Sequence, residues 1–218
     1  MTDTSGEEHP ILRTLVARYP DVRPCIGEIA AAFDVLHATY RGGGKVLLCG
    51  NGGSAADCDH IVGELMKGFL RPRPLPPPMR DRLAATYGAH GDYLATHLQG
   101  ALPAISLASH VAVLTAYAND VAADMAFAQQ VYGYGRPGDV LRGISTSGNA
   151  RTVLHALQVA RVLHLRTIGL TGRDGGALSA LRDVVVRVPR DGTVAIQEGH
   201  LPIYHALCIM REEALFDT

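Results

Sequence analysis

Residues 45–56, which read KVLLCGNGGSAA, decide the fold of this chain. The run Lys45–Cys49 predicts a short buried strand, because it lacks polar alternation and ends at a glycine. The segment Gly50-Asn51-Gly52-Gly53 predicts a tight loop, and we expect a helix over about 56–69 directly after it. A buried strand that leads through a glycine-rich loop into a helix is typical of open parallel α/β sheets.

The same alternation of strand and helix recurs along the chain. Five short apolar strands separated by helices favour a three-layer α/β/α sandwich around a five-stranded parallel sheet. Ligands bind such folds beyond the carboxyl ends of the strands, so we expect the site in the loops after the first and third strands. The further strands are expected over 102–107, 139–144, 165–170 and 183–188, and the helices between them over 109–117, 124–134 and 150–163.

The N-terminal part of the chain precedes this alternation. Residues 11–40 have helical periodicity, and they predict two helices that are separated at Pro20 and Pro24. Their apolar faces exceed what one sheet edge needs, so we expect them to pack in the core of an oligomer. We predict an N-terminal helical region over 1–40 and a single α/β domain over 41–218.

Two later segments are unusual. Residues 70–99 form an insertion into the domain: a proline-rich extended stretch, a short helix over about 79–87, and a glycine- and histidine-bearing loop. A C-terminal helix is expected over about 199–216, because proline is tolerated in the first turn of a helix and Pro202 would then stand there. Gln197 would lie just before this helix, free to bend inward.

The bulk composition excludes several classes of function. The 218 residues carry a formal net charge of −1, so nothing electrostatic points to nucleic acid or to an anionic membrane. The longest apolar run, around 101–107, is far too short to span a bilayer. The acidic, polar N-terminus does not resemble a signal peptide. The four cysteines form no CxxC pair and are expected to be reduced thiols in a cytoplasmic protein.

Two of the expected loops suit a phosphate. In the first, the backbone N–H groups of Gly52 and Gly53 lie at a helix N-terminus, and Ser54 adds a hydroxyl. In the second, Ser145-Thr146-Ser147 provides three hydroxyls in a row, and Gly148 lets the backbone approach a ligand closely. The alternative is that these residues only cap helices and form turns. Two such loops at one sheet edge favour the phosphate site.

The first loop also fits the GxGxxA pattern of dinucleotide-binding proteins. That motif needs an acidic residue about twenty positions further on, which holds the ribose. The chain has Arg71-Pro72-Arg73-Pro74 in that region, and its second strand ends in Ser106-Leu107-Ala108-Ser109. Because the acid is missing, a nicotinamide-dependent enzyme is disfavoured.

Candidate proton-transfer residues lie on the expected helices. His60 and Glu64 are four residues apart, so they share one helix face. Spacing alone favours a surface His–Glu pair over a catalytic one. His205 lies among apolar residues, so a buried core histidine is the alternative to a functional role.

Taken together, the motifs resemble one known family. In chain order they are Gly50-Asn51-Gly52-Gly53-Ser54, His60-x-x-x-Glu64, Ala118-Asn119-Asp120, Gly143-Ile144-Ser145-Thr146-Ser147-Gly148-Asn149, Leu170-Thr171-Gly172-x-Asp174-Gly175-Gly176, and Gln197-Glu198-x-His200 with His205. They resemble the phosphoheptose isomerases of the SIS (sugar isomerase) superfamily. The resemblance runs from about residue 40 to the C-terminus, except for the insertion. It is the combination that is specific, since no single motif is.

The resemblance implies a reaction and the residues that perform it. It implies interconversion of sedoheptulose 7-phosphate and D-glycero-D-manno-heptose 7-phosphate through an enediol, which needs a base at carbon and an acid at oxygen. Glu64 and His205 would be the acid–base pair, and Asn51 and Asp120 would contact the sugar. The other implied substrate- and phosphate-binding residues are Gly52, Gly53, Ser54, Asn119, Ser145, Thr146, Ser147, Asn149 and Gln197.

The resemblance also implies a homotetramer with active sites at subunit interfaces, and a bound zinc ion (Zn2+). The implied zinc ligands are His60, Glu64, Gln197 and His205. Gln197 and His205 are eight residues apart, about 12 Å along a regular helix, so they would reach one ion only at full stretch. A neutral amide is also a weak ligand for zinc. We therefore expect modest, exchangeable metal binding.

Departures from the family pattern leave two alternatives open. The family has an arginine shortly after the catalytic glutamate, where this chain has Lys67-Gly68-Phe69, and Ala150 and Val194 replace a family serine and aspartate. These changes and the insertion favour an isomerase of another sugar phosphate as the first alternative. The second is a non-catalytic, phosphosugar-binding regulator. Relatives without catalysis lack the glutamate and histidine, both of which are present here.

Overall fold

The computed structural model describes residues 9–216. Its five strands form one fully parallel sheet in the order β2-β1-β3-β4-β5, which confirms the predicted fold class. The inner strands β1 and β3 are buried along their whole length, as their apolar sequences require. The strands are β1 (Val46–Gly50), β2 (Ala104–Ser106), β3 (Val140–Ile144), β4 (Arg166–Thr171) and β5 (Val184–Arg187).

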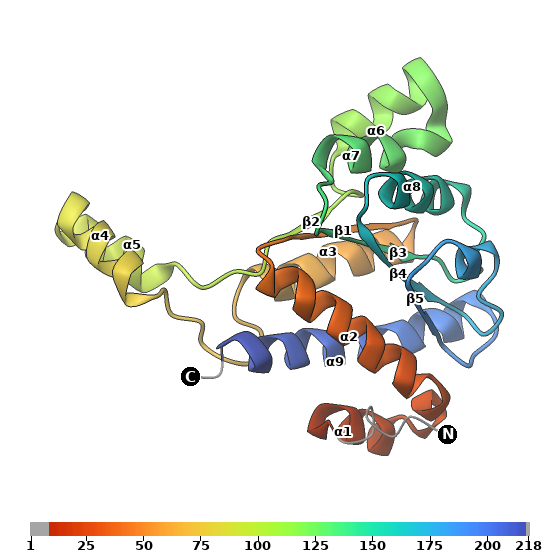
Figure 1. Cartoon of the computed structure of the whole chain (residues 1–218), viewed down its shortest axis with the longest axis horizontal. Helices are drawn as coiled ribbons and strands as arrows, with labels where there is room; N and C mark the ends of the chain where they lie inside the picture. The colour runs from red at the N-terminus through yellow and green to blue at the C-terminus, as the bar shows by residue number, and fades with distance from the viewer. Residues whose placement is uncertain (1–8, 217–218) are drawn as a thin grey trace.

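Helices cover both faces of this sheet (Figure 1). Alternate residues of β3 point to opposite sides: Val140 and Ile144 pack with one group of helices, and Leu141 packs with the other. The first group is α1 (Pro10–Arg18), α2 (Ile26–Arg41), α3 (Gly53–Met66) and α9 (Thr193–Phe216). The second group includes α7 (Ala126–Tyr134) and α8 (Arg151–Val162).

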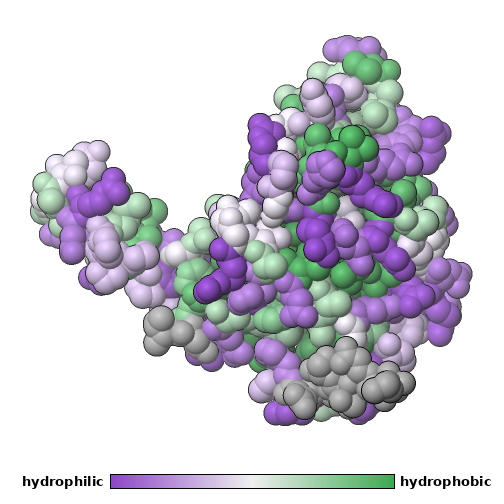
Figure 2. Space-filling model, in the orientation of Figure 1, coloured by the Kyte–Doolittle hydropathy of each residue, from purple (hydrophilic) through white to green (hydrophobic). Residues whose placement is uncertain are grey.

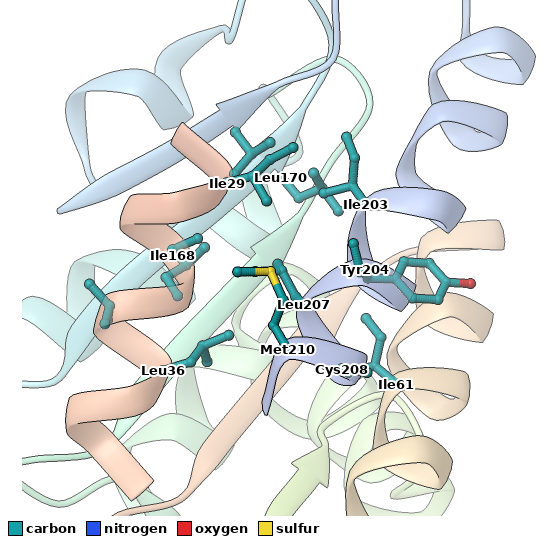
Figure 3. Packing of buried hydrophobic residues seen from close by; sticks show 14 of the residues in the cluster. Ile29, Leu36, Ile61, Ile168, Leu170, Ile203, Tyr204, Leu207, Cys208 and Met210 are labelled. Atoms are coloured by element: carbon teal, nitrogen blue, oxygen red, sulfur yellow. The ribbon is translucent and has the colours of Figure 1, made fainter. Parts of the chain in front are cut away.

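The larger core lies between the sheet, α2 and α9. Figure 3 shows Ile29 and Leu36 of α2 facing Leu207 and Met210 of α9, with strand residues such as Leu170 beside them. The N-terminal helices therefore bury much of their apolar surface within the same chain. The 3₁₀ segment η2 (Pro20–Cys25) separates α1 from α2, where the two prolines predict a break.

Short helical segments complete the layer around α7. They are α6 (Val111–Tyr117), the π-helical η3 (Ala118–Ala122), the 3₁₀ turn η4 (Ala123–Met125) and, after β4, the 3₁₀ turn η5 (Ala177–Ala180). Within residues 9–216, no helix combines the length and the apolar composition needed to cross a membrane.

The start of the C-terminal helix differs from our expectation. Helix α9 begins at Thr193, so Pro202 lies inside it and not in its first turn. Pro202 has no N–H for the carbonyl of Glu198, but Glu198 is exposed, so water can donate to that carbonyl. Gln197 is consequently a helical residue, and the expected bend before the helix is wrong.

Residues 70–99 form an arm that extends away from the sheet (Figures 1 and 2). Helix α4 (Pro77–Tyr87) is close to the expected one, but the expected loop after it is a second helix, α5 (Ala89–His97). A Cβ at Gly91 would collide with the carbonyl of Leu83, so this glycine permits close helix contact and does not mark a loop. The two helices pack mainly on each other.

The two ends of the arm meet at the body of the molecule. Pro74 and Gln99 form an antiparallel bridge, and the N–H of Gly100 donates to the carbonyl of Arg73 at 2.7 Å. The arm therefore leaves the domain and returns to it at the same place.

Candidate active site

Two helices that run side by side in the same direction build the site. Gln197, near the start of α9, packs against Gly53 at the start of α3. Further along, Tyr204 contacts Asp57, and the carboxylate of Glu212 reaches the chain just after α3. Because both helices run in the same direction, residues of α3 and α9 meet in matching order, starting at the carboxyl rim of the sheet.

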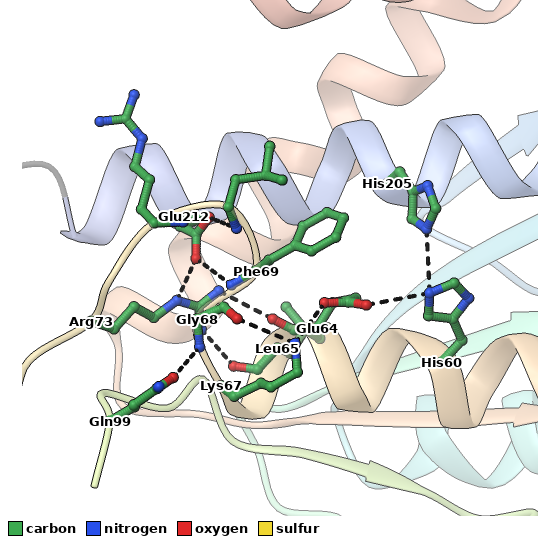
Figure 4. Close-up of polar contacts among 12 residues, drawn as sticks. His60, Glu64, Leu65, Lys67, Gly68, Phe69, Arg73, Gln99, His205 and Glu212 are labelled. Carbon is green, nitrogen blue, oxygen red and sulfur yellow. Dashed lines mark hydrogen bonds and ion pairs between the residues drawn. The ribbon is translucent and has the colours of Figure 1, made fainter. Parts of the chain in front are cut away.

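His60, Glu64 and His205 come together on this helix pair (Figure 4). The Nε2 atom of His60 lies 3.3 Å from Oε1 of Glu64 and 3.4 Å from Nε2 of His205. The other carboxylate oxygen of Glu64 accepts from Nζ of Lys67 at 3.2 Å. The His60–Glu64 pair is thus not an isolated surface pair, since a histidine from α9 joins it.

Two residues behind His60 orient its ring. The hydroxyl of Tyr204 lies 3.1 Å from Oδ1 of Asp57 and 3.1 Å from Nδ1 of His60. A carboxylate can only accept, so the Tyr204 proton goes to Asp57, and Nδ1 of His60 then donates to the Tyr204 oxygen. This leaves a lone pair on Nε2 of His60, directed at Glu64 and His205. Two acceptor atoms, Nε2 of His60 and Oε1 of Glu64, thus meet beside Nε2 of His205, an arrangement that attracts a proton or a cation.

Burial sets the charge of several of these groups. It lowers the pKa of His205, and the neighbouring His60 lowers it further, so His205 is neutral near pH 7. Burial also raises the pKa of Tyr204, which therefore keeps its proton. The pKa of Asp57 is raised by burial and held back by the bond from Tyr204.

The first loop borders a cleft at the carboxyl edge of the sheet. A cavity of about 270 Å³ lies between this loop and the segments α6 to α7, and Asn51, Gly52 and Thr152 are among its lining residues. The amide of Asn51 donates to the Thr152 hydroxyl at 2.8 Å, which joins the first loop to the start of α8. Ser54 is buried beneath the loop.

The loop after β3 is held by its own hydrogen bonds. The hydroxyl of Ser145 accepts from the N–H of Ala150 at 3.4 Å, and that of Ser147 accepts from the N–H of Asn149 at 3.2 Å. Thr146 is half-buried, and Ser147 is exposed. The loop packs closely on the next one, since a Cβ at Gly148 (φ +66°) would collide with the carbonyl of Gly175. This loop thus contains hydroxyls that accept from its own backbone N–H groups, and it also exposes Ser147 to solvent.

The remaining candidates lie apart from these groups. Asn119 and Asp120 are exposed on η3, and the Asn119 amide donates to the Asp120 carboxylate at 2.8 Å. Neither residue is among those that line the cleft at the first loop. Asn149 points away from that cleft, because its Oδ1 accepts from the N–H of Ala177 at 2.9 Å.

Sequence reasoning missed Asp57, Tyr204 and Thr152. Asp57 lies three residues before His60 and Tyr204 directly before His205, so proximity to the candidate pair was the available signal. Tyr204 reads as one more apolar core residue in the pattern of α9, and it is indeed buried. Only the pairing of α3 with α9 shows that its hydroxyl serves His60.

Two pairs of side-chain atoms, His60–Glu64 and His60–His205, are spaced as two ligands of one metal ion would be. Zinc bonded at 2.0–2.1 Å in a tetrahedron separates its ligand atoms by about 3.3–3.4 Å. The His60–Glu64 and His60–His205 distances of 3.3 Å and 3.4 Å match this edge. Among the described residues, however, no three His, Cys, Asp or Glu side chains are arranged to enclose one ion. Gln197 stands two turns away from His205, against Gly53.

The fold and the loops at its rim define the class of protein. The family model of the SIS domain matches residues 24–86 and 91–172, and these matches include the first loop, the His60–Glu64 pair and the loop after β3. The chain is therefore a SIS-domain protein.

Individual relatives narrow this class. The phosphoheptose isomerase of Rhodospirillum rubrum is 39% identical over 191 residues, which cover 88% of this chain and 88% of that protein. The solved phosphoheptose isomerase of Francisella tularensis superimposes with a TM-score of 0.72 at 30% identity, covering 96% and 98% of the two chains. That of Neisseria gonorrhoeae gives 0.69 at 33%, covering 90% and 92%. The chain belongs to the phosphoheptose isomerase family.

Proposed function

We propose that this chain interconverts sedoheptulose 7-phosphate and D-glycero-D-manno-heptose 7-phosphate. The observation that carries the proposal is the convergence of Glu64 and His205 on His60. His60 and Glu64 lie on α3, whose first turn borders the loop after β1. Family membership supports the same reaction.

The spacing along α3 suits the length of the substrate. Six residues separate Ser54 from His60 and ten separate it from Glu64, which corresponds to about 9 Å and about 15 Å of helix rise. An extended seven-carbon sugar phosphate matches the shorter span, so with its phosphate at the loops C1 and C2 would lie near His60. Helical side chains lean toward the N-terminus, so the Glu64 side chain would reach back toward these carbons. The amides of Gly52 and Gly53, and the hydroxyls of Thr146 and Ser147, would bind the phosphate.

Two side chains would move the protons. Glu64, through Oε1, removes the proton from the carbon next to the carbonyl, and the electron pair forms the enediol double bond. His205, neutral at neutral pH, transfers the proton between the two sugar oxygens. Glu64 then returns its proton to the neighbouring carbon, which completes the shift of the carbonyl. Asn51 would contact the sugar hydroxyls from the cleft.

We propose that a zinc ion binds weakly at the same place. His60 would hold it together with Glu64 or His205 as the side chains stand, and the third of these ligands and Gln197 would reach it only after rearrangement. When bound, the ion would polarise the sugar carbonyl. The incomplete enclosure of the donors supports the modest, exchangeable binding expected from the sequence.

Replacing Glu64 tests the assignment. Glu64→Gln keeps the size of the side chain but removes the base, so turnover of sedoheptulose 7-phosphate should fall by about 10²–10⁴-fold while the sugar phosphate still binds. NMR of the sugar anomeric signals, with and without a chelator, measures turnover, and calorimetry measures binding. Glu213→Gln, on the outer side of α9, is the matched control.

The outcomes separate the alternatives. Normal turnover by Glu64→Gln contradicts the assigned base. Turnover of shorter sugar phosphates but not of sedoheptulose 7-phosphate, by the unaltered chain, assigns an isomerase of another substrate. Tight binding without any turnover assigns a phosphosugar-binding regulator.

We further propose that the chain assembles as a homotetramer, as the family resemblance implies. A groove of about 380 Å³ between α1 and α9 supports this. Its walls are mostly apolar, with Ile11, Leu15 and Leu201 among them, and His205 and Phe69 also line it. A neighbouring subunit seated there would cover His205 and shield proton transfer from water.

A further inference from the structure

Two arginines lie in the apolar layer between the sheet and α9. Arg142 of β3 is 2% exposed, and Arg211 of α9 is fully buried. Arg142 lies on the same face of β3 as Val140 and Ile144, so it points toward α9. Among the described residues, the Nε and Nη2 atoms of Arg142 and all three nitrogen atoms of the Arg211 guanidinium have no hydrogen-bond partner.

Arg142 and Arg211 both line one small internal cavity. It leaves about 10 Å³ for the centre of a water-sized particle, which is room for one such particle. The rest of its wall is apolar except for the hydroxyl of Tyr40 and the thiol of Cys208: Leu36, Val46, Leu48, Ile61, Leu65 and Leu207.

A third buried arginine, Arg73, has the hydrogen-bond acceptors that Arg142 and Arg211 lack. Arg73 is 1% exposed, but its Nε donates to Glu212 at 2.8 Å and its terminal nitrogens donate to the carbonyls of Leu65 and Glu64. Among the described residues, Arg211 contacts the ring of Phe33, 3.9 Å from its central carbon, and it feels the charge of Asp34 without a hydrogen bond. A ring face attracts the cation but accepts no hydrogen bond from its N–H edge.

None of the described side chains that line the cavity carries a negative charge; Asp57 acts on Arg142, and Asp34 on Arg211, only from outside it. Burial raises the pKa of Cys208 to about 12 and raises that of Tyr40, so both are neutral. The Tyr40 hydroxyl has no hydrogen-bond partner either. Burial lowers the pKa of Arg211 to about 10, and it also lowers the pKa of Arg142. Arginine side chains keep their charge in proteins. Buried charges are normally paired.

We propose that this cavity binds one small monovalent anion of the chloride type. The N–H groups of Arg142 and Arg211 would donate to it from two sides, and the Tyr40 hydroxyl would donate from α2. The size of the cavity excludes phosphate and other polyatomic anions. The ion would tie β3 to α2 and α9, directly beneath the helix pair that carries the candidate active site.

Bromide replacement tests the site in the full-length protein. Crystals grown with bromide as the only halide should show an anomalous difference peak between the two guanidinium groups. A peak there supports the proposal. Density without an anomalous signal means water, and it overturns the proposal.

Thermal unfolding gives an independent test. At constant ionic strength, the unfolding temperature should rise as chloride replaces isethionate, which is too large to enter, because an anion bound only to the folded state stabilises it. The double variant Arg142→Leu with Arg211→Met should lose this dependence. Arg166→Leu, an exposed arginine that pairs with Asp183, should keep it.

An equal chloride dependence in the double variant would contradict the proposal. If the double variant fails to fold, the bromide experiment on the unaltered chain still decides the question. Neither measurement depends on catalytic activity, so the anion site and the isomerase assignment can fail separately.

Discussion

His200 links the stability of the protein to pH. The side chain is fully buried in α9, and burial lowers its pKa to about 4, from 6.5 in an exposed histidine. The folded state therefore binds fewer protons than the unfolded chain between these two values. The neutral ring favours folding fully above about pH 6.5, and this contribution is lost as the pH falls toward 4.

We predict that His200 alone removes about 3 kcal/mol of stability over this range, since each pKa unit corresponds to 1.36 kcal/mol. Urea unfolding at pH 7 and at pH 4 measures the loss, and His200→Leu is the comparison. The pH-dependent loss should be smaller by that amount in the variant. Parallel profiles for the two proteins would rule out the role of His200.

At the scale of single residues, the sequence indicates some roles and hides others. Helical spacing puts His60 and Glu64 on one helix face but favours a surface pair, and only the family resemblance assigns them a role. The structure brings both side chains to His205. Tyr204 was not predictable as a polar residue, because a tyrosine in an apolar stretch is usually a core residue. The hydrogen bonds of its hydroxyl depend on α3, which is distant in sequence.

At the scale of elements, Glu212 fixes the end of α3 to α9. Its carboxylate accepts from the N–H groups of Phe69 and Leu70 at 2.8 Å and from Arg73 at 2.8 Å (Figure 4). Burial alone would raise the pKa of Glu212, but these donors lower it, so the group is ionised. They also draw the chain out of the helix after Met66, which is why α3 ends earlier than expected.

We predict that Glu212→Gln destabilises the protein by about 3–5 kcal/mol, because it leaves Arg73 buried beside a neutral amide. Glu213→Gln is the matched control. Glu213 pairs with Arg71 near the surface, so its replacement should cost at most about 1 kcal/mol. Chemical denaturation of both variants measures the difference. Similar losses would show that the Glu212 contacts contribute little.

The strands were the most predictable elements. A fully buried strand has no polar alternation, so runs such as Val46–Cys49 stand out in the sequence. The predicted helix boundaries are wrong where one residue type is compatible with two different local structures. Pro202 predicts a first helical turn but lies within α9, and Gly91 is typical of a loop but allows α4 and α5 to touch.

At the scale of the whole molecule, the arm is separate from the core. Because Pro74 and Gln99 are already paired, replacing residues 75–98 by Asn-Gly should close a two-residue turn without moving the sheet. We predict that this deletion changes the stability of the domain by less than about 1 kcal/mol.

Light scattering on the same variant relates the arm to assembly. A tetramer before and after the deletion places the subunit contacts on the body, including the groove between α1 and α9. A tetramer that dissociates on deletion assigns contacts to the arm. A monomer before deletion contradicts the proposed assembly.

The fold class was predictable because five strand–helix units in order allow few arrangements of a parallel sheet. The strand–helix pattern does not predict properties that depend on other molecules or on the cell. The domain boundary at residue 40, the tetramer and the cytoplasmic location stay predictions. The position of Asn119 and Asp120 on an exposed segment likewise leaves their sugar contacts to experiment.

The parallel course of α3 and α9 determines which changes in chain length natural variants can tolerate. One residue inserted or deleted between Ser54 and His60 would rotate every later side chain of α3 by about 100° and carry His60 and Glu64 away from α9. Within the arm, whose ends already meet, insertions of many residues leave the rest of the molecule in place. Homologous chains should therefore vary freely in length between positions 74 and 99 and keep a constant count from Ser54 to Glu64.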